Sequence, residues 1–516
     1  MTLKKRLGMI LAIAAVAAGV YGVGKAGIAI KQTQEPQESE NLFGHRETLY
    51  LWYTDEALTD YLGSVALSYS EYQDEVRIVP VYSSGLEYLE TINQASLTTD
   101  QVPDLYIVSN DSLEKAYLAG LASELRVPEG EKALREVFPE AAINAVTYHD
   151  KQIAYPFYFE TSSLLYNKTY LNDWARNQIE AEADTQTGEE AQSLIDSGAV
   201  TPEETDEEGT EGNADTSAVP QEAVEQKVQE TLPKTIDDIL TFADEYDAPE
   251  QVEAVFKWDV SDIFYNYFFV GDSIDVGGPD GDRADKIHIY NEDAIRCMRV
   301  YQSLNQFFSI DTKEISYDAV LQDFIDGKIV YTVATTDALA KIEQAKAEGN
   351  CPYEYQVSKL PDVSDTLKSS SLSVTQSVVV NGYSEKKDMA NDFAVYLTEI
   401  CTADLYGRTG KLPVYTDSDL YDDPNLAAFR EEYEASVPMP KMIETSNFWV
   451  ELEIAFAKIW DGEDANEDLK ALSEKIMGQV VGGEYTEEYL DVPVEETSDA
   501  QEGDMPEAGT SEETAE

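Results

Sequence analysis

The stretch IAYPFYFETSSLLYNKTYL, residues 153–171, gathers aromatic side chains around one carboxylate, that of Glu160. Some of these aromatic residues carry a hydroxyl group, as Tyr158 does, whereas Phe157 and Phe159 are wholly apolar. A run of this kind suits a buried strand, the wall of an active site, or a surface on which a sugar ring stacks. The sequence on either side of it narrows the choice.

The composition describes a large, acidic, globular protein. A chain of 516 residues is too long for one compact core, and a hydrophobic content of 43% is enough to fill two or more. The formal net charge is -65 at pH 7, from 101 acidic against 36 basic residues. This charge argues against a nucleic-acid-binding protein, which needs basic groups to displace the counterions of phosphates. It is compatible with a cationic ligand, with a device for solubility, or with a salt-adapted proteome.

Residues able to hold a metal ion are scarce. The cysteines Cys297, Cys351 and Cys401 are widely spaced and form no CxxC pair, so neither a zinc cluster nor a disulfide framework is expected. Asp residues cluster in PDGDRAD, residues 279–285, but this run lacks the twelve-residue spacing and the final Glu of a calcium loop. We expect a turn there, and we predict no metal site and no cofactor.

The N-terminus has the pattern of an exported protein. Basic residues at positions 4–6 precede an uncharged run over residues 7–24. We interpret residues 1–30 as a signal peptide or as a single membrane anchor, because the run approaches the roughly 20 residues that span a bilayer. A polar spacer follows over residues 31–46. The protein is thus expected on the extracytoplasmic face of the cell membrane, tethered by an uncleaved segment or released by cleavage.

Strands and helices alternate in the segment after the spacer. Strands are expected over residues 48–54, 75–83 and 102–109, and a helical spacing of apolar residues follows each of them. Alternation at this pitch indicates an α/β fold, with a parallel sheet covered by helices. No glycine-rich phosphate loop follows any of these strands in the sequence, which disfavours a nucleotide-binding fold.

Two acidic segments differ in composition from the rest of the chain. Residues 174–231 are rich in Glu, Asp, Thr and Gly and have few large apolar side chains, and residues 487–516 have the same character. A segment that buries little apolar surface does not offset the entropy lost on folding. We therefore predict a disordered acidic insertion in the first case and a disordered acidic tail in the second.

Several motifs occur in an order that is typical of one family. The stretch 153–171 reads as a strand that reaches YP, followed by LLYNK and a helix. Together with the motifs below, it resembles the extracellular solute-binding proteins of ABC importers, of the maltose-binding-protein-like type. The resemblance spans residues 47–480, apart from the acidic insertion. The supporting motifs are TLYLWYTDEALTDYL (48–62), VPDLYIVSNDSLEKAYLAGLASEL (102–125), LPKTIDDILTFADEY (232–246), FIDGKIVYTVA (324–334), YDDPNLAAF (421–429) and SNFWVEL (446–452).

The resemblance implies a type II periplasmic-binding-protein fold. Such a fold has two α/β lobes, a ligand cleft between them and three hinge crossings of the chain. By position the crossings fall near Phe159, Thr375 and Asp422. The expected boundaries are 47–158 plus 376–422 for lobe 1, and 159–375 plus 423–484 for lobe 2, which includes the insertion.

The same resemblance implies a binding protein and not an enzyme. Such a protein works as a monomer that captures a carbohydrate-like solute between its lobes, and its closed form docks on a membrane permease. Two alternatives stay open. A ligand-sensing surface protein would use the same fold, and a surface glycosidase would need paired carboxylates, for which Glu160 and Asp111 are candidates.

Polar residues at the ends of the predicted strands are the first candidates for the binding site. Thr54 and Asp55 end the first strand, and Asn110 and Asp111 end the third, where open α/β sheets bind their ligands. The resemblance matches Asp111 to a carboxylate that contacts sugar hydroxyls. Asp55 and Asp111 suit the N-terminal cap of a helix equally well.

Further candidates come from the resemblance. It matches Glu160 to a carboxylate at the crossing between the lobes, and we include its neighbour Tyr158. It matches Trp449 to a tryptophan on which a sugar ring stacks. Trp258 and Asp259 lie near the segment of the second lobe that contacts the ligand.

Two departures from the family pattern bear on the size of the ligand. Asp337 and Val108 fall where maltodextrin-binding members have stacking tryptophans. With fewer stacking surfaces, a long maltodextrin is disfavoured. The acidic side chains would suit a small sugar, an amino sugar or a cationic ligand.

Overall fold

The computed structural model describes residues 46–85, 87–98, 102–126, 132–196, 219–308, 310–415 and 419–493, and for 184–196 it describes the main chain alone. The predicted signal peptide or anchor, and almost all of the polar spacer, therefore lie outside the described residues. Among the helices that are described, none combines the length and the apolar character needed to cross a membrane.

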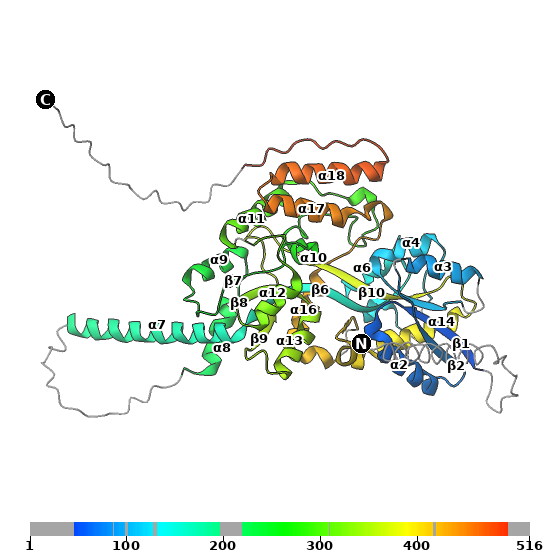
Figure 1. Ribbon diagram of the computed structural model, residues 1–516, viewed down its shortest axis with the longest axis horizontal. Coiled ribbons are helices and arrows are strands. Elements are labelled where there is room, and N and C mark those ends of the chain that lie inside the picture. The colour runs from blue at the N-terminus through cyan, green and yellow to red at the C-terminus, as the bar shows by residue number, and fades with distance from the viewer. Residues whose placement is uncertain are drawn as a thin grey trace, which may run out of the picture.

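Strands and helices alternate through much of the described chain (Figure 1). The strands are β1 (Glu47–Tyr53), β2 (Val76–Tyr82), β3 (Leu105–Ser109), β4 (Thr147–Tyr148), β5 (Lys151–Gln152), β6 (Tyr155–Asn167), β7 (Ala254–Phe256), β8 (Ile329–Thr335), β9 (Tyr355–Ser358), β10 (Leu372–Val380), β11 (Leu412–Pro413) and β12 (Val437–Pro438). The helices are α2 (Thr59–Tyr72), α3 (Tyr88–Thr98), α4 (Leu113–Leu118), α5 (Leu134–Val137), α6 (Glu140–Val146), α7 (Lys168–Asp196), α8 (Gln221–Thr231), α9 (Ile236–Glu245), α10 (Ile263–Asn266), α11 (Glu292–Phe308), α12 (Tyr317–Ile325), α13 (Asp337–Ala347), α14 (Lys387–Val395), α15 (Leu405–Thr409), α16 (Pro424–Ala435), α17 (Phe448–Trp460) and α18 (Ala465–Val481).

The first part of the sheet confirms the predicted parallel strands. β1 lies between β2 and β3, and both pairs are parallel, because a helix returns the chain to the same end of the sheet after each strand. Alternate residues of β1 are buried (Leu49, Leu51 and Tyr53), since successive side chains of a strand point to opposite faces. The carboxyl ends of β1 and β3 lie at one edge of the sheet, with Asp55 and Asn110 just beyond them.

β6 is the strand that joins the two halves of the sheet, whose order is β2-β1-β3-β10-β6-β8-β7. Residues 155–161 of β6 pair with β10, whereas residues 162–167 pair with β8 and β9. Every residue of β6 is buried except Glu160, which is half-buried. In Figure 1, β6 and β10 run between the helices of the first half and those of the second. This pairing agrees with a crossing near Phe159.

The residues predicted at the other crossings lie close to β6. Thr375 of β10 is the register partner of Phe159, and its hydroxyl oxygen lies 2.7 Å from that of Tyr433 in α16. The ring of Tyr433 stacks on Phe159, with ring centroids 4.1 Å apart. Asp422 ends a short 3-10 helix, from which the chain passes into α16. These contacts gather the predicted crossings into one place, while the lobe boundaries stay a prediction.

The acidic insertion is helical at both of its described ends, so the prediction of disorder is wrong there. α7 runs through the start of the segment and α8 forms its end, and residues 197–218 between them lie outside the described residues. Val224 and Val228 of α8 are buried in the core of that half of the protein, and Trp174 of α7 packs against the same core. The apolar residues of the insertion are few, but a spacing of four places Val224 and Val228 on one face of a helix.

The first residues of the predicted disordered tail are also packed, so that prediction is wrong for residues 487–493. Val492 is buried, and its carbonyl oxygen accepts a hydrogen bond from Nη1 of Arg299 at 3.0 Å. The carbonyl oxygen of Leu490 accepts one from the side chain of Asn466 at 2.8 Å. These bonds hold the segment against α11 and α18. The remainder of the tail lies outside the described residues.

Candidate functional site

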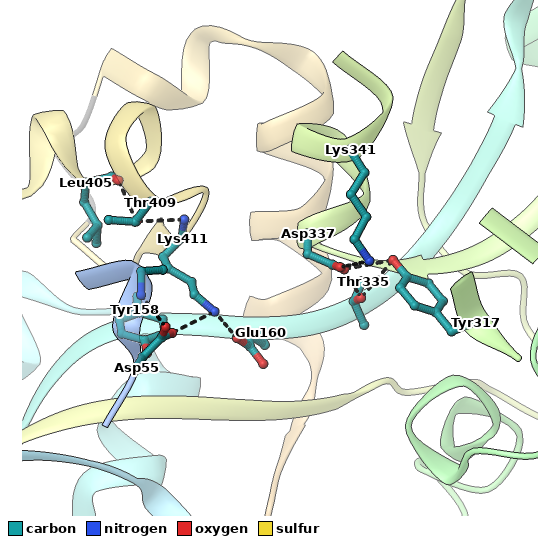
Figure 2. Close-up of polar contacts among 11 residues, drawn as sticks. Asp55, Tyr158, Glu160, Tyr317, Thr335, Asp337, Lys341, Leu405, Thr409 and Lys411 are labelled. Carbon is teal, nitrogen blue, oxygen red and sulfur yellow. Dashed lines mark hydrogen bonds and ion pairs between the residues drawn. The ribbon is translucent and has the colours of Figure 1, made fainter. Parts of the chain in front are cut away.

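Lys411 connects two of the predicted site residues (Figure 2). Its ammonium nitrogen lies 2.9 Å from Oε1 of Glu160 and 3.1 Å from Oδ2 of Asp55. Asp55 follows β1, and Glu160 lies on β6. One lysine therefore connects the edge of the first half of the sheet with the strand that crosses to the second half. Sequence reasoning missed Lys411, because it belongs to none of the motifs that carry the family pattern.

Local structure fixes the position of Lys411. The next two residues form β11, which pairs with β6 at Phe159 and Tyr158. Gly410, directly before Lys411, has a left-handed backbone conformation with φ of 71°, which ends α15 and turns the chain towards β6. Backbone pairing on one side and a tight turn on the other thus hold this lysine beside the crossing strand.

The Asp55–Lys411–Glu160 bridge is charged and partly shielded from water. The side chains of Lys411, Asp55 and Glu160 are 23%, 29% and 38% exposed, so a ligand in solution can reach all three. Burial lowers the pKa of Lys411, but the Glu160 and Asp55 carboxylates outweigh burial and raise the pKa above its usual value. Lys411 is therefore a cation at neutral pH.

Tyr158 contacts both Lys411 and Asp55 of this bridge. Its ring centroid lies 5.5 Å from the ammonium nitrogen of Lys411, and its hydroxyl donates to Oδ2 of Asp55 at 3.4 Å. Burial, followed by the charges of Asp55 and Glu160, raises the pKa of Tyr158 well above its usual value. The hydroxyl group therefore stays protonated and remains a donor.

Asp55 caps a helix and also takes part in the candidate site, which are the two roles that the sequence allowed. Its Oδ1 accepts a hydrogen bond of 3.0 Å from the main-chain nitrogen of Ala57 and caps a short 3-10 helix, Glu56–Leu58. Its Oδ2 faces Lys411. Capping holds the carboxylate in place without using the oxygen that forms the ion pair. Thr54, immediately before it, is exposed.

Asp337 forms a second polar network. Its Oδ1 accepts hydrogen bonds from the hydroxyls of Tyr317 at 2.8 Å and Thr335 at 2.5 Å, and its Oδ2 lies 2.9 Å from the ammonium nitrogen of Lys341. Burial would raise the pKa of Asp337, but the hydrogen bonds from Thr335, Lys341 and Tyr317 outweigh it and lower that pKa. The ring of Tyr317 stacks on Tyr265, with centroids 4.7 Å apart.

The two networks are neighbours along β6. Thr335 of β8 is the register partner of Ser162 in β6. Ser162 follows Glu160 by two residues, so the two side chains point to the same face of the strand. In Figure 2 both networks lie along that strand. The structure thus brings Asp55, Glu160 and Asp337 of the predicted set into one region.

Comparison with protein families assigns the chain. The family described as bacterial extracellular solute-binding protein matches residues 68–429, which is more than half of the chain. The chain belongs to this family. As a bacterial extracellular solute-binding protein, it binds a solute outside the cytoplasm and is not an enzyme, as the resemblance implied.

Solved structures of sugar-binding proteins share the fold of this solute-binding protein. A cyclo/maltodextrin-binding protein in complex with maltotetraose has a TM-score of 0.63 and 18% identity, and the match covers 86% of this chain and 99% of that one. An extracellular solute-binding protein from Staphylococcus aureus in complex with maltose has a TM-score of 0.63 and 17% identity, over 85% and 99% of the two chains. A maltose-binding periplasmic protein from Listeria monocytogenes in complex with maltose has a TM-score of 0.61 and 20% identity, over 85% and 99%. These likenesses confirm the predicted two-lobed α/β fold. No curated protein sequence matches the chain.

Asn110 has a structural role in this solute-binding protein. It is completely buried, and its side chain donates to the carbonyl oxygen of Met439 at 2.6 Å and accepts from the main-chain nitrogen of Thr375 at 2.9 Å. These bonds tie the end of β3 to β10 and to the segment after β12. A ligand would have to break them to reach the amide, so we do not keep Asn110 in the proposed site. Asp111, next to it, is exposed and accepts a hydrogen bond from the hydroxyl of Ser109, so it stays a candidate.

Trp258 and Asp259 lie in the interior and leave no surface for a ligand. Trp258 is completely buried, stacks on Phe256 with centroids 4.5 Å apart, and donates from its indole nitrogen to Asn266 at 2.8 Å. Asp259 is buried and accepts hydrogen bonds from the main chain and the hydroxyl of Ser261, at 2.9 and 2.6 Å. The resemblance placed both near the ligand, and the structure corrects this: Trp258 packs in the core and Asp259 stabilises a turn.

Trp449 differs from Trp258 in its exposure. It is half-buried at the start of α17, edge-to-face with Tyr267 at 5.5 Å and with Phe448 at 5.0 Å. Phe448 is completely buried in the core, whereas part of the neighbouring indole of Trp449 is accessible. Trp449 therefore stays a candidate for stacking on a ligand.

Within the described residues, no group of three or more His, Cys, Asp or Glu side chains is arranged to hold a metal ion. The aspartate-rich segment near residue 280 forms the turn that its sequence predicts. The main-chain nitrogen of Gly281 donates a hydrogen bond of 2.9 Å to the carbonyl oxygen of Gly278. Both glycines have positive φ, which glycine adopts readily in turns.

Proposed function

We propose that this solute-binding protein is the extracellular substrate-binding component of an ABC importer. It captures a carbohydrate-like solute between its two lobes and delivers the solute to a membrane permease. The observation that carries the proposal is the Asp55–Lys411–Glu160 bridge, which presents acceptors and a donor side by side at the strand that joins the two halves of the sheet, with Glu160 on that strand. The maltose and maltotetraose complexes of proteins with this fold support a carbohydrate as the solute.

The chemistry of the bridge suits hydroxyl groups. A sugar hydroxyl donates to a carboxylate oxygen of Glu160 or Asp55 and accepts from the ammonium group of Lys411. Trp449 supplies a flat face for the C–H side of a sugar ring. Contacts from both lobes to one ligand stabilise the closed arrangement, and the permease recognises that arrangement. The lobes we propose are those predicted from the sequence.

The proposed solute is a small sugar or amino sugar and not a long maltodextrin. Asp337 is held by three protein groups at a position where an aromatic ring would otherwise stack. Val108 is buried in β3 and offers no platform. With these two surfaces absent, a long chain of sugar rings loses the stacking that holds its outer rings.

A thermal-shift screen tests the proposal. Full-length protein is mixed with monosaccharides, oligosaccharides, amino sugars and polyamines, and the unfolding temperature is recorded. A ligand at one hundred times its dissociation constant adds about 2.7 kcal/mol to the stability of the folded state, which gives a clear shift. We expect a sugar to give that shift and the replacements Glu160→Ala and Trp449→Ala to abolish it. A hit that survives both replacements would remove the proposed site, and a panel without a sugar hit would remove the carbohydrate and favour the sensing alternative.

We further propose that the protein works as a monomer on the outer face of the cell membrane. Its predicted first 30 residues either anchor it there or are cleaved during export. Fractionation of cells, followed by mass spectrometry of the N-terminus, distinguishes the two fates. Co-purification of a permease with the protein, in the presence of the solute, supports transport over sensing.

A further inference from the structure

Asp55, Glu160 and Asp337 of the candidate site each form an ion pair with a lysine of the same chain. Asp55 and Glu160 share Lys411, and Asp337 pairs with Lys341. The two oxygens that contact Lys411 are at most about 6 Å apart, the sum of the two contacts. Without Lys411, two negative charges would face each other across that distance in a partly buried place, where their repulsion is only weakly screened.

Lys411 has a fixed position in the Asp55–Lys411–Glu160 bridge. β11 anchors its main chain to β6, the ring of Tyr158 lies below its ammonium group, and its side chain is 23% exposed. A surface lysine keeps most of its rotamer freedom, whereas two ion pairs and a ring hold this one in a single place. A ligand that reaches Glu160 therefore meets the lysine in position.

We infer that Lys411 sets the charge class of the ligand, so that the site takes a neutral polyhydroxylated solute and rejects a cationic one such as an amino sugar. The inference rests on the proposed function, since the ligand has to contact Glu160 or Asp55. It also narrows the class of ligand. The acidic side chains alone would suit a cation, but their ion pairs with Lys411 make the site unsuitable for one.

The charges of the bridge disfavour both cationic and anionic ligands. The ammonium group of a ligand would have to displace Lys411 from the same two carboxylates, and the displaced lysine would stay nearby as a like charge. An anionic ligand would meet two carboxylates for each lysine, which gives the bridge a net negative charge. Hydroxyl groups avoid both costs, because they donate to the lone pairs of the carboxylates that remain and accept from Lys411.

The test compares Lys411→Met with a matched control. Met keeps the apolar stem of lysine and removes the charge. The control is Lys359→Met, because Lys359 is 64% exposed and pairs with Glu431 at 3.4 Å, so the same charge is lost from another ion pair. Binding of maltose, glucosamine and glucuronate to full-length wild type and to both variants is measured by isothermal titration calorimetry at low salt.

We expect the wild type to bind maltose more tightly than glucosamine or glucuronate. In Lys411→Met, affinity for glucosamine should rise at least about tenfold, because the two carboxylates lose their internal cation, and affinity for maltose should fall by about the same factor. The control should leave every affinity within about twofold of wild type, because an exposed charge interacts weakly through water of high dielectric constant.

Each outcome bears on one claim. If glucosamine binds Lys411→Met no better than wild type, or if wild type prefers glucosamine, the inference is wrong. If the control reproduces the gain, net charge and not the site is responsible, and the inference is again wrong. If maltose binds none of the three proteins, the proposed carbohydrate function is weakened, while the change in glucosamine affinity still decides the role of Lys411.

Discussion

The ammonium group of Lys441 donates a hydrogen bond of 2.9 Å to the carbonyl oxygen of Asn144, which precedes it by 297 residues. It also donates to the carbonyl oxygen of Asp280, and its side chain is almost completely buried. Asn144 belongs to α6, beside the first half of the sheet, and Asp280 to the aspartate-rich turn. A single buried cation therefore holds together three segments that are distant in the sequence.

Replacement of Lys441 should change the pH dependence of stability. Burial lowers its pKa to about 8, although Asp280, Asp282 and Glu114 act in the opposite direction. The unfolded chain then binds more protons between pH 8 and the usual value near 10.5, so the free energy of unfolding rises with pH in that window.

We expect the wild type to gain about 1 kcal/mol per pH unit relative to Lys441→Met between pH 8 and pH 9.5. The variant should be less stable at pH 7 by about 3 kcal/mol, because buried carboxylates lose their cation. Urea denaturation of both proteins across this range measures the two effects. Parallel curves for the two proteins would show that Lys441 has an ordinary pKa.

Glu432 predicts a pH effect of the opposite sign. Burial raises its pKa to about 7, although a hydrogen bond of 3.2 Å from the main-chain nitrogen of Leu360 acts against it. The folded state then binds more protons than the unfolded chain between the usual value near 4.5 and pH 7, so its contribution to stability is lost as pH rises through that window.

The replacement Glu432→Gln keeps the acceptor for Leu360 and removes the charge. We expect the wild type to lose at most about 1 kcal/mol per pH unit relative to this variant between pH 5 and pH 7. Denaturation at three or four pH values within the window measures it. A difference that is constant with pH would contradict the shifted pKa.

Replacement of Trp258 and of Trp449 should have different effects on stability and on ligand affinity. Trp258→Ala should lower the free energy of unfolding by about 3 to 5 kcal/mol, because it leaves a cavity in the core, and should leave affinity unchanged in the protein that folds. Trp449→Ala should lower affinity at least about tenfold with a smaller loss of stability. Trp258→Phe serves as a milder core variant. An affinity loss from Trp258→Phe would return that residue to the site.

The helical ends of the acidic insertion should contribute to stability and not to binding. Val228→Asp places a charge in the core beside α8 and should lower the free energy of unfolding by about 3 kcal/mol. The exposed neighbour Glu225, replaced by Ala, should change it by less than about 0.5 kcal/mol. Thermal unfolding of the two variants compares them directly. Equal stabilities would mean that α8 is detached in solution.

Much of the fold was predictable because it depends on local patterns. The apolar and aromatic run over residues 48–54 predicts β1, and the run around Glu160, with the family pattern, predicts a strand at a crossing. Composition failed in the insertion, since an average over many residues does not show that Val224 and Val228 share one face of a helix.

The site was predictable only in part. Asp55, Glu160 and Asp337 follow from strand ends and from the family pattern, but their partner Lys411 is 251 residues from Glu160. A contact over that separation depends on the pairing of β11 with β6, which no local pattern specifies. Trp258 was assigned wrongly because its position in the family pattern does not show that it is completely buried against Phe256.

β6 is one continuous strand paired with both halves of the sheet. If the two lobes close as we propose, we expect Glu160 to lie near the axis about which they turn. A group on an axis moves little when the bodies on either side rotate, whereas the side chains at the rim travel far. We expect a solute to form its contact with Glu160 first, in the open protein, and to keep that contact unchanged as the rim closes over it. The contact with Glu160 would then be present both when the solute first binds and after the protein has closed.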